Sequence, residues 1–235
     1  MKHPWVILFD IDGTLLTVDS AFIRPLLRDI VSELNINYQG VETDSFSGRT
    51  DHDILSSFLE QNEQAASQYQ LLKSGYIERL AKELAPQHVL KHEFVDDAIS
   101  FFSDSSFEIG LLTGNFPKAA QTKLKAANIQ LEIKIGAYGD LHKDRNMLPQ
   151  IALNKFEQLF DIEADPQKFV VIGDTPRDIL CAQSAGMRVV AITTGSYSHD
   201  ELASYRPDLI IDSLKEPEVW FNALIGNTVN QTSIQ

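Results

Sequence analysis

The sequence is poor in cysteine and in positive charge, and each shortage excludes a class of protein. The 235 residues include one cysteine, Cys181, so an intrachain disulfide and a paired-cysteine metal site are both excluded. A reduced, cytoplasmic setting fits this use of cysteine. Lysine and arginine number 20 against 33 aspartates and glutamates. The resulting net charge of −13 argues against nucleic acid or an anionic membrane as a partner.

Long apolar runs are also missing. The apolar start at residues 5–9 stops at Asp10, so it is too short for a signal-peptide core or a membrane span, and no later run reaches spanning length. Hydrophobic residues make up 43% of the chain and charged residues 23%, as in ordinary globular proteins. A chain of this length can form one large domain or a domain with an insertion.

Short apolar runs alternate with helical patterns over most of the chain. The expected strands are residues 6–9, 108–112, 133–136, 169–172, 188–192 and 209–211. The expected helices between them include residues 118–127, 148–160 and 177–185. Strands that alternate with helices predict an α/β fold with a parallel sheet covered on both faces.

The interval from residue 16 to residue 85 breaks this alternation. The expected helices there are residues 21–34, 51–60 and 64–84. Pro86 lies just beyond them and suits a boundary. We therefore expect a sheet-containing core at residues 1–15 and 86–235, with an all-helical domain inserted at residues 16–85.

Two aspartates, Asp10 and Asp12, follow the first apolar run and precede Gly13 and Thr14. Side chains two apart on a strand project to the same side, so both carboxylates can address one site at the carboxyl end of the strand. Open α/β sheets bind ligands at that end. Two close carboxylates raise each other's pKa, so the pair indicates a cation site or proton transfer. An ordinary Asp-Gly turn is the alternative.

The expected strand at residues 108–112 is followed by Thr113, Gly114 and Asn115. A threonine hydroxyl and the N–H groups after it can hold a phosphoryl oxygen. A turn in which Thr113 or Asn115 caps the next helix would produce the same pattern. The segment is therefore a candidate phosphoryl-binding site that needs support from the other motifs.

The expected strand at residues 169–172 ends in a glycine and Asp174, and Asp178 lies one turn into the next helix. Asp174 can bind a hard divalent cation, with Asp178 as a direct ligand or as indirect support. Thr175 and Asp178 also fit a helix-capping box. The two interpretations are compatible, because a cap would fix the turn that presents Asp174.

Two basic residues, Lys143 and Arg145, precede the expected helix at residues 148–160. A cation at this place can neutralise negative charge on a nucleophile and on a phosphoryl group. The alternative is a pair of solvated surface charges, which is the usual state of lysine and arginine.

In their order along the chain, these segments resemble the motifs of haloacid-dehalogenase-superfamily phosphatases, close to the phosphoglycolate-phosphatase-like branch. The matching segments are DIDGT at 10–14, LLTGN at 111–115, a basic residue at 143–145 and GDTPRDILCAQSAGM at 173–187. The resemblance implies a Rossmann-like core with a helical cap domain at residues 16–85. It also implies a Mg²⁺ cofactor and hydrolysis of a small-molecule phosphate monoester, phosphoglycolate-like or a sugar phosphate, through an aspartyl-phosphate intermediate.

The resemblance assigns a role to each matching residue. Asp10 resembles the nucleophile, which is also a Mg²⁺ ligand. Asp12 resembles the general acid/base, with its backbone carbonyl on the metal. Thr113 resembles the phosphoryl-binding hydroxyl, and Gly114 and Asn115 beside it are candidate substrate-binding residues.

Two further matches concern the metal. Asp174 resembles the metal-binding acid, and Asp178 matches the second acid of the same motif.

The catalytic cation has two candidates. Counted back from Ala152, Lys143 falls where the family's usual lysine stands, but Asp144 follows it where proline is usual. Some relatives use an arginine from a DRNxL-like segment, which corresponds to Arg145. We favour Lys143 and keep Arg145 as the alternative.

Within the insert, Gly48 and Arg49 precede the expected helix at residues 51–60. We expect the insert to decide which phosphate ester enters the site. Arg49 is a candidate for reaching the active site and contacting a carboxylate or phosphate of that substrate. A helix start capped by Thr50 is the alternative.

Other activities share this fold. A haloacid dehalogenase would not need an acid/base at Asp12, whereas a phosphomutase of the β-phosphoglucomutase type stays open. A phosphonoacetaldehyde hydrolase would need a cap lysine such as Lys73 or Lys82 for a Schiff base. Outside these enzymes, the alternatives are a receiver-like module, which would lack a helical insert, and a catalytically silent phosphate-binding relative. We expect a small-molecule partner, no nucleic acid or membrane partner, and a monomer or homodimer.

Overall fold

The computed structural model describes residues 3–60, 65–104 and 106–226. Its centre is a six-stranded sheet in the order β5-β4-β1-β6-β7-β8, with every neighbouring pair parallel. The strands are β1 (Trp5–Phe9), β4 (Phe107–Thr113), β5 (Ile135–Tyr138), β6 (Phe169–Gly173), β7 (Arg188–Ile192) and β8 (Leu209–Ile211). The predicted α/β class is confirmed, and each expected strand is present.

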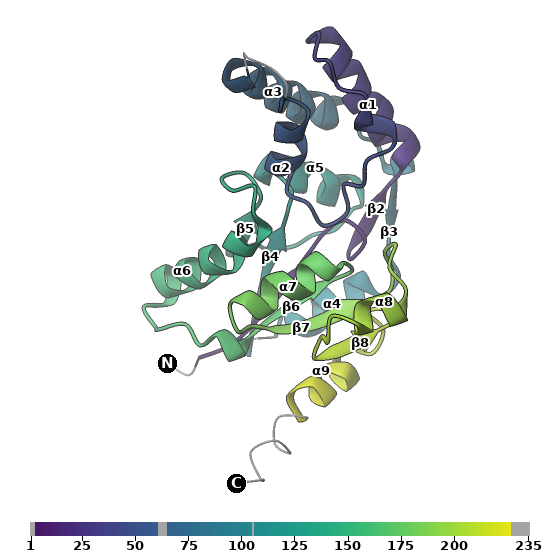
Figure 1. Cartoon of the computed structure of the whole chain (residues 1–235). Helices are drawn as coiled ribbons and strands as arrows, with labels where there is room; N and C mark the ends of the chain where they lie inside the picture. The colour runs from purple at the N-terminus through teal and green to yellow at the C-terminus, as the bar shows by residue number, and fades with distance from the viewer. Residues whose placement is uncertain (1–2, 61–64, 105, 227–235) are drawn as a thin grey trace.

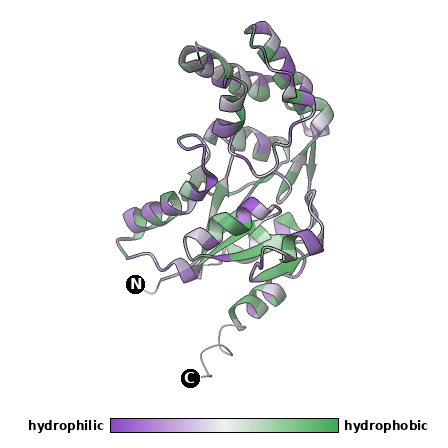
Figure 2. Cartoon of the chain, viewed as in Figure 1, coloured by the Kyte–Doolittle hydropathy of each residue, from purple (hydrophilic) through white to green (hydrophobic). Residues whose placement is uncertain are grey.

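Helices cover both faces of the sheet, and β1 shows why. Its side chains alternate: Val6 and Leu8 pack in one core cluster, and Ile7 and Phe9 pack in the other. The first cluster includes α6 (Leu148–Phe160), α7 (Pro176–Ser184) and α8 (His199–Ala203). The second includes α4 (Val95–Phe102), α5 (Pro117–Ala126) and α9 (Pro217–Gly226). In Figure 2 the strands are largely green, as expected of a sheet buried on both sides.

A second group of helices lies at the upper end of the molecule in Figure 1: α1 (Ser20–Glu33), α2 (Asp51–Ser57) and α3 (Ala65–Glu83). They share a core that includes Leu27, Leu55 and Leu72, and Phe116, the residue before α5, packs into the same core. The helices expected at residues 21–34 and 51–60 are present, the second of them shorter. Residue 64, the expected start of the third, lies outside the described residues.

Two short strands, β2 (Leu16–Val18) and β3 (Val89–Lys91), pair antiparallel between the sheet and the helical group. They were not predicted, because three residues are too few to show a period-two pattern. This ribbon lies beside both expected junctions of the inserted domain. The division into residues 1–15 with 86–235 and residues 16–85 stays a prediction.

None of the helices in the described part of the chain has the length and apolar character needed to cross a membrane. The cytoplasmic location expected from the sequence stays a prediction.

Candidate active site

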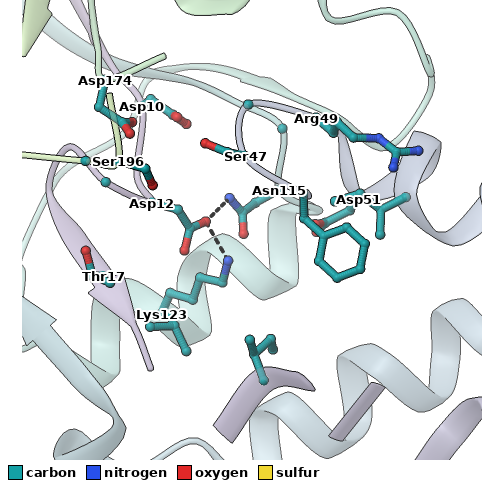
Figure 3. Close-up of a pocket in the computed structure, with 18 of the residues that line it drawn as sticks. Asp10, Asp12, Thr17, Ser47, Arg49, Asp51, Asn115, Lys123, Asp174 and Ser196 are labelled. Carbon is teal, nitrogen blue, oxygen red and sulfur yellow. Dashed lines mark hydrogen bonds and ion pairs between the residues drawn. The ribbon is translucent and has the colours of Figure 1, made fainter. Parts of the chain in front are cut away.

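Asp10 and Asp12 line one cavity of about 430 Å³ at the carboxyl edge of the sheet (Figure 3). Asp10 follows β1, and its N–H still donates to the Ile172 carbonyl of β6 at 2.9 Å. The Asp10 side chain is buried, whereas the Asp12 side chain is 41% exposed. One carboxylate is therefore held by the sheet, and the other faces the cavity from the turn that follows.

The turn after Asp12 depends on Gly13. Its φ of +84° is a conformation that side chains other than glycine rarely adopt, and a Cβ there would overlap the Asp174 carboxylate. The Gly13 carbonyl accepts a hydrogen bond from the Thr194 hydroxyl at 2.6 Å. The glycine of the first motif is therefore needed so that Asp174 can approach the backbone.

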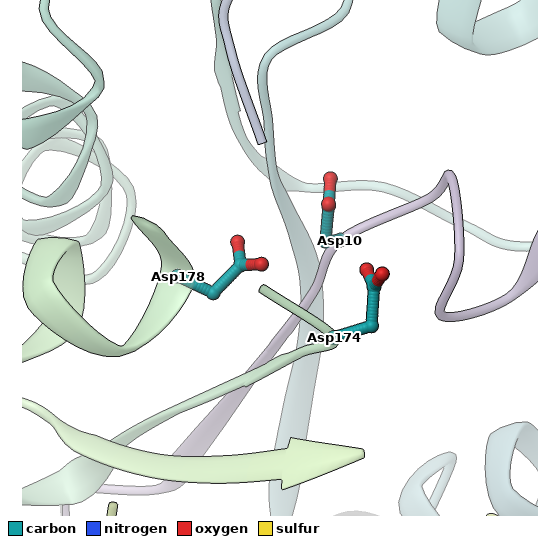
Figure 4. Close-up of side chains that lie close together, drawn as sticks. All are labelled: Asp10, Asp174 and Asp178. Atoms are coloured by element: carbon teal, nitrogen blue, oxygen red, sulfur yellow. The ribbon is translucent and has the colours of Figure 1, made fainter. Parts of the chain in front are cut away.

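Three buried carboxylates meet at this edge: Asp10, Asp174 and Asp178 (Figure 4). One oxygen from each lies within 4.8 Å of the others. Asp174 follows β6, and Asp178 belongs to the first turn of α7. The capping box predicted there is present, because the Asp178 N–H donates to the Thr175 hydroxyl and the Thr175 N–H donates to Asp178 Oδ2.

The electrostatics of this cluster favour a bound cation. Burial raises the pKa of both Asp10 and Asp174, and the Asp178 carboxylate raises each further, against the effect of Arg145. Three buried carboxylates opposed by one guanidinium leave an excess of negative charge that a divalent cation would offset. Asp178 is already engaged by Thr175 and Arg145, which leaves Asp10 and Asp174 as the better-placed ligands.

Of the two basic candidates, Arg145 is the one inside the cluster. Asp144 accepts the Asn146 N–H at 2.9 Å and starts a 3₁₀ turn that places Arg145 in the interior, 6% exposed. Its Nη2 donates to Asp178 Oδ1 at 2.5 Å and lies 3.3 Å from Asp10 Oδ2.

Lys143 lies elsewhere. It is exposed and absent from the cavity lining, and its carbonyl accepts the Thr50 hydroxyl at 3.0 Å. The sequence-based preference for Lys143 over Arg145 therefore finds no support in the geometry, because the turn that begins at Asp144 buries only the second of the two cations.

Gly114 and Asn115 line the cavity, whereas Thr113 is not part of its lining. Thr113 is fully buried at the end of β4, and its Oγ1 accepts both the N–H and the Nδ2 of Asn115, at 3.3 and 3.0 Å. Asn115 Nδ2 also donates to Asp12 Oδ2 at 2.7 Å. The threonine thus positions Asn115, and Asn115 holds Asp12.

Lys123 of α5 is a site residue that the motifs did not indicate. Its side chain is 7% exposed and its ammonium donates to Asp12 Oδ2 at 2.6 Å (Figure 3). The sequence does hold a signal for it, because Lys123 occupies the same helical stripe as the buried Ala119, Ala120 and Leu124. A lysine in an otherwise apolar stripe needs a buried partner.

Asp51 is a second residue missed as part of the site. It lines the cavity, is 9% exposed, and its Oδ2 accepts the Phe116 N–H at 2.7 Å. Burial raises the pKa of Asp51 to about 6, although Lys123 and this hydrogen bond act in the opposite direction. The sequence offered only a helix-terminal acid, so tertiary packing alone reveals the position.

Arg49 lines the cavity, but its guanidinium is engaged. Its Nε donates to Oδ2 of Asp53 in α2 at 2.6 Å, and the side chain points away from Asp10 and Asp12 in Figure 3. Lys73 and Lys82, the candidates for a Schiff base, do not line the cavity. The Lys73 ammonium lies over the Phe116 ring, 4.5 Å from its centroid.

A family model described as HAD-hydrolase-like matches residues 143–217. The pyrophosphatase PpaX of Bacillus thuringiensis is 23% identical over 211 residues, 89% of this chain and 93% of that protein. Both matches agree with the resemblance found in the sequence motifs.

Solved structures give the same fold. The β-phosphoglucomutase of Clostridium difficile matches with a TM-score of 0.70 and 18% identity, over 97% of this chain and 100% of that chain. A predicted phosphoglycolate phosphatase from Haemophilus somnus matches with a TM-score of 0.64 and 17% identity, over 94% and 99%. The chain therefore shares the fold of these proteins, and over residues 143–217 it is similar to the HAD-hydrolase-like family.

Proposed function

We propose that this chain is a Mg²⁺-dependent phosphoric monoester hydrolase that acts on a small molecule through an aspartyl-phosphate intermediate. The observation that carries the proposal is the meeting of Asp10, Asp174 and Asp178, with one oxygen of each within 4.8 Å of the others, beside Arg145 at the edge of the cavity. The curated relative, a pyrophosphatase, supports the same class of chemistry.

In this proposal Asp10 attacks the phosphorus in line and forms an acyl phosphate while the alkoxide leaves. Arg145 lies 3.3 Å from Asp10 Oδ2, so its positive charge is available to the oxygens of the transferring group. Gly114 and Asn115 line the same cavity, so the backbone at Gly114 is proposed as a contact for phosphoryl oxygens.

Asp12 is the proposed acid/base. Its Oδ2 is held by Lys123 and Asn115, whereas its Oδ1 makes no hydrogen bond with the described residues. A carboxylate fixed by one oxygen can present the other, which would give its proton to the leaving alkoxide and later take one from the attacking water.

The donor set fits a hard divalent cation, since it consists of buried carboxylate oxygens. Asp10 and Asp174 would hold Mg²⁺, with the Asp12 carbonyl beside them and Asp178 fixing Arg145. The cation would supply charge stabilisation for the phosphoryl oxygens.

The test is release of inorganic phosphate from p-nitrophenyl phosphate, in Mg²⁺ and in EDTA, by the wild type and by Asp10→Asn. We expect release in Mg²⁺ only, and at least a thousandfold lower turnover in Asp10→Asn because the nucleophile is gone. Asp200→Asn is the matched control, since Asp200 is fully exposed on α8, and it should retain turnover.

Release that survives EDTA or Asp10→Asn would refute the proposal. Transfer of phosphate between sugar positions without net release would instead favour the phosphomutase alternative. No release by a folded wild type would favour a catalytically silent relative.

A further inference from the structure

The cavity has two unlike sides. The side built on the sheet carries the carboxylates and Arg145, as described above. On the other side, helices α1, α2 and α3 and the loop before α2 contribute an apolar wall: Ile23 and Leu27 of α1, Phe46 of the loop, Ile54 and Leu55 of α2, and the ring of Tyr76 of α3. Ser47, Arg49 and Asp51 line the cavity from the same part of the chain. The carbon skeleton of the leaving alcohol would lie against this apolar wall.

The cations that line the cavity are already paired. Lys123 is held by Asp12 at 2.6 Å, Arg49 by Asp53 at 2.6 Å, and Arg145 by Asp178 at 2.5 Å. These are the lysines and arginines among the described residues of the lining, and the lining also holds four aspartates, Asp10, Asp12, Asp51 and Asp174.

With Mg²⁺ on Asp10 and Asp174 serving the transferring phosphoryl group, a second anionic group on the substrate would meet only lysines and arginines that already have a carboxylate partner. Burying an unpaired charge is costly, whereas burying hydrocarbon against hydrocarbon is favourable. The paired cations disfavour a carboxylate or a second phosphate on the leaving group, and the apolar wall favours a leaving group made of hydrocarbon.

We propose that the preferred substrates are phosphate monoesters whose alcohol is mainly hydrocarbon and carries no second anionic group. This inference rests on the proposed phosphatase activity and specifies its substrate class. It separates the chain from enzymes that act on pyrophosphate or phosphoglycolate, whose substrates carry a second anion.

The test is a homologous series: ethyl, propyl, butyl and hexyl phosphate, with phosphoglycolate as the near-isosteric anionic partner of propyl phosphate. The primary alkanols are nearly equal as leaving groups, so the trend reports burial of hydrocarbon. We expect kcat/KM to rise about fourfold with each added methylene until the cavity is full. We expect propyl phosphate to exceed phosphoglycolate at least tenfold.

A flat series, or a preference for phosphoglycolate, overturns the inference. If p-nitrophenyl phosphate is hydrolysed while the series stays flat, the proposed function stands and only the substrate class is wrong. If no ester releases phosphate, the proposed function fails and the inference fails with it.

A pair of lysine variants tests the wall directly. Ile23→Lys places a cation in the apolar wall at a half-buried position of α1, and Ala21→Lys places one on the exposed side of the same helix, outside the cavity. We expect Ile23→Lys to raise the preference for phosphoglycolate over propyl phosphate about tenfold and Ala21→Lys to leave it unchanged. Equal effects of the two variants, or no shift in either, would contradict the role of the wall.

Binding can be measured without turnover in Asp10→Asn. Calorimetry of the alkyl phosphates in Mg²⁺ should give a heat-capacity change that becomes more negative with chain length, because more apolar surface is buried. A heat-capacity change that does not vary with chain length would mean that the alkyl group is not buried against the apolar wall, and it would overturn the inference.

Discussion

Arg145 shows how much a single buried side chain decides in this molecule. It links two acids from different elements, Asp10 after β1 and Asp178 in α7, and it packs beneath the cavity at 6% exposure. Its Nη2 contacts both carboxylates, and the guanidinium also donates to the Gly48 carbonyl from Nη1 at 3.3 Å and to the Leu112 carbonyl from Nη2 at 3.4 Å. The single nitrogen of an ammonium cannot reproduce contacts spread over the two ends of this planar fork.

We therefore predict opposite outcomes at the two basic positions. Arg145→Lys should lower kcat for p-nitrophenyl phosphate at least tenfold while the protein still folds, because the charge is kept and the fork is lost. Lys143→Met should stay within about twofold of the wild type, since Lys143 is exposed and outside the cavity lining. The reverse ranking in steady-state kinetics would restore Lys143 as the catalytic cation.

Asp51 gives a prediction about stability. Its pKa is raised from 3.8 to about 6 in the folded protein, chiefly by burial. Between these two pH values the folded state binds more protons than the unfolded state, so the free energy of unfolding falls as the pH rises, and the penalty is complete above pH 6. Asp51→Asn should therefore raise the free energy of unfolding by on the order of 1–3 kcal/mol at pH 7.5, with the gain disappearing near pH 4.

Denaturant unfolding at several pH values checks this prediction. Asp97→Asn is the control, because Asp97 also lies in the first turn of a helix, α4, but is exposed. It should lose a few tenths of a kcal/mol and show no gain at pH 7.5. A loss of stability at pH 7.5 in Asp51→Asn would mean that its pairing with Lys123 outweighs the cost of burial.

At the scale of elements, the start of α7 serves both folding and the site. Its capping box joins Thr175 to Asp178, and Asp178 in turn holds Arg145. Helix α8 begins with the same arrangement, Ser198 with Glu201, on an exposed part of the surface. The two caps are locally alike and differ in what their acids contact.

Thr175→Val and Ser198→Ala should each lower the free energy of unfolding by about 1 kcal/mol, because each loses the hydroxyl that accepts an N–H of its helix. Only Thr175→Val should also lower kcat, by about tenfold, since Asp178 is then free to move away from Arg145. Midpoints of chemical unfolding and steady-state kinetics measure the two effects separately. Equal kcat values in the two variants would show that Asp178 needs no cap to hold Arg145.

At the scale of the whole molecule, helix α2 is joined to the loops after β4 and β5 through backbone hydrogen bonds at the site itself. The Asp51 N–H donates to the Gly114 carbonyl at 2.7 Å, and the His52 N–H donates to the Gly139 carbonyl at 3.2 Å. Gly114 lies so close to the Arg49 carbonyl that a Cβ at position 114 would overlap it. The close approach of the segment at Arg49 to the loop after β4 therefore requires glycine at position 114.

Gly114→Ala should push α2 away from the sheet, raise KM for p-nitrophenyl phosphate about tenfold and destabilise the protein by about 1–3 kcal/mol. Gly226→Ala, at the end of α9 where a Cβ meets nothing within 4 Å, is the control and should leave KM unchanged. Thermal unfolding and initial rates measure both. An unchanged KM in Gly114→Ala would mean that cap position does not control substrate binding.

The order of strands and helices and the identity of the acids could be read from the sequence, because both depend on local signals. Buried parallel strands are short apolar runs, and the carboxyl ends of such strands lie at one edge of the sheet. Asp10, Asp12 and Asp174 each follow such a run, so their approach to one another required only the fold class. The family resemblance and the α/β class inferred in this way are confirmed.

Tertiary structure decided the rest, because burial and direction depend on segments that are far apart in the chain. Lys123 and Asp12 are separated by 111 residues and meet only after α5 packs beneath the cap. Arg145 is buried and Lys143, two residues before it, is exposed because of a single 3₁₀ turn. The apolar wall of the cavity consists of side chains from three helices and a loop, and no local sequence pattern in these segments indicates that they line a cavity.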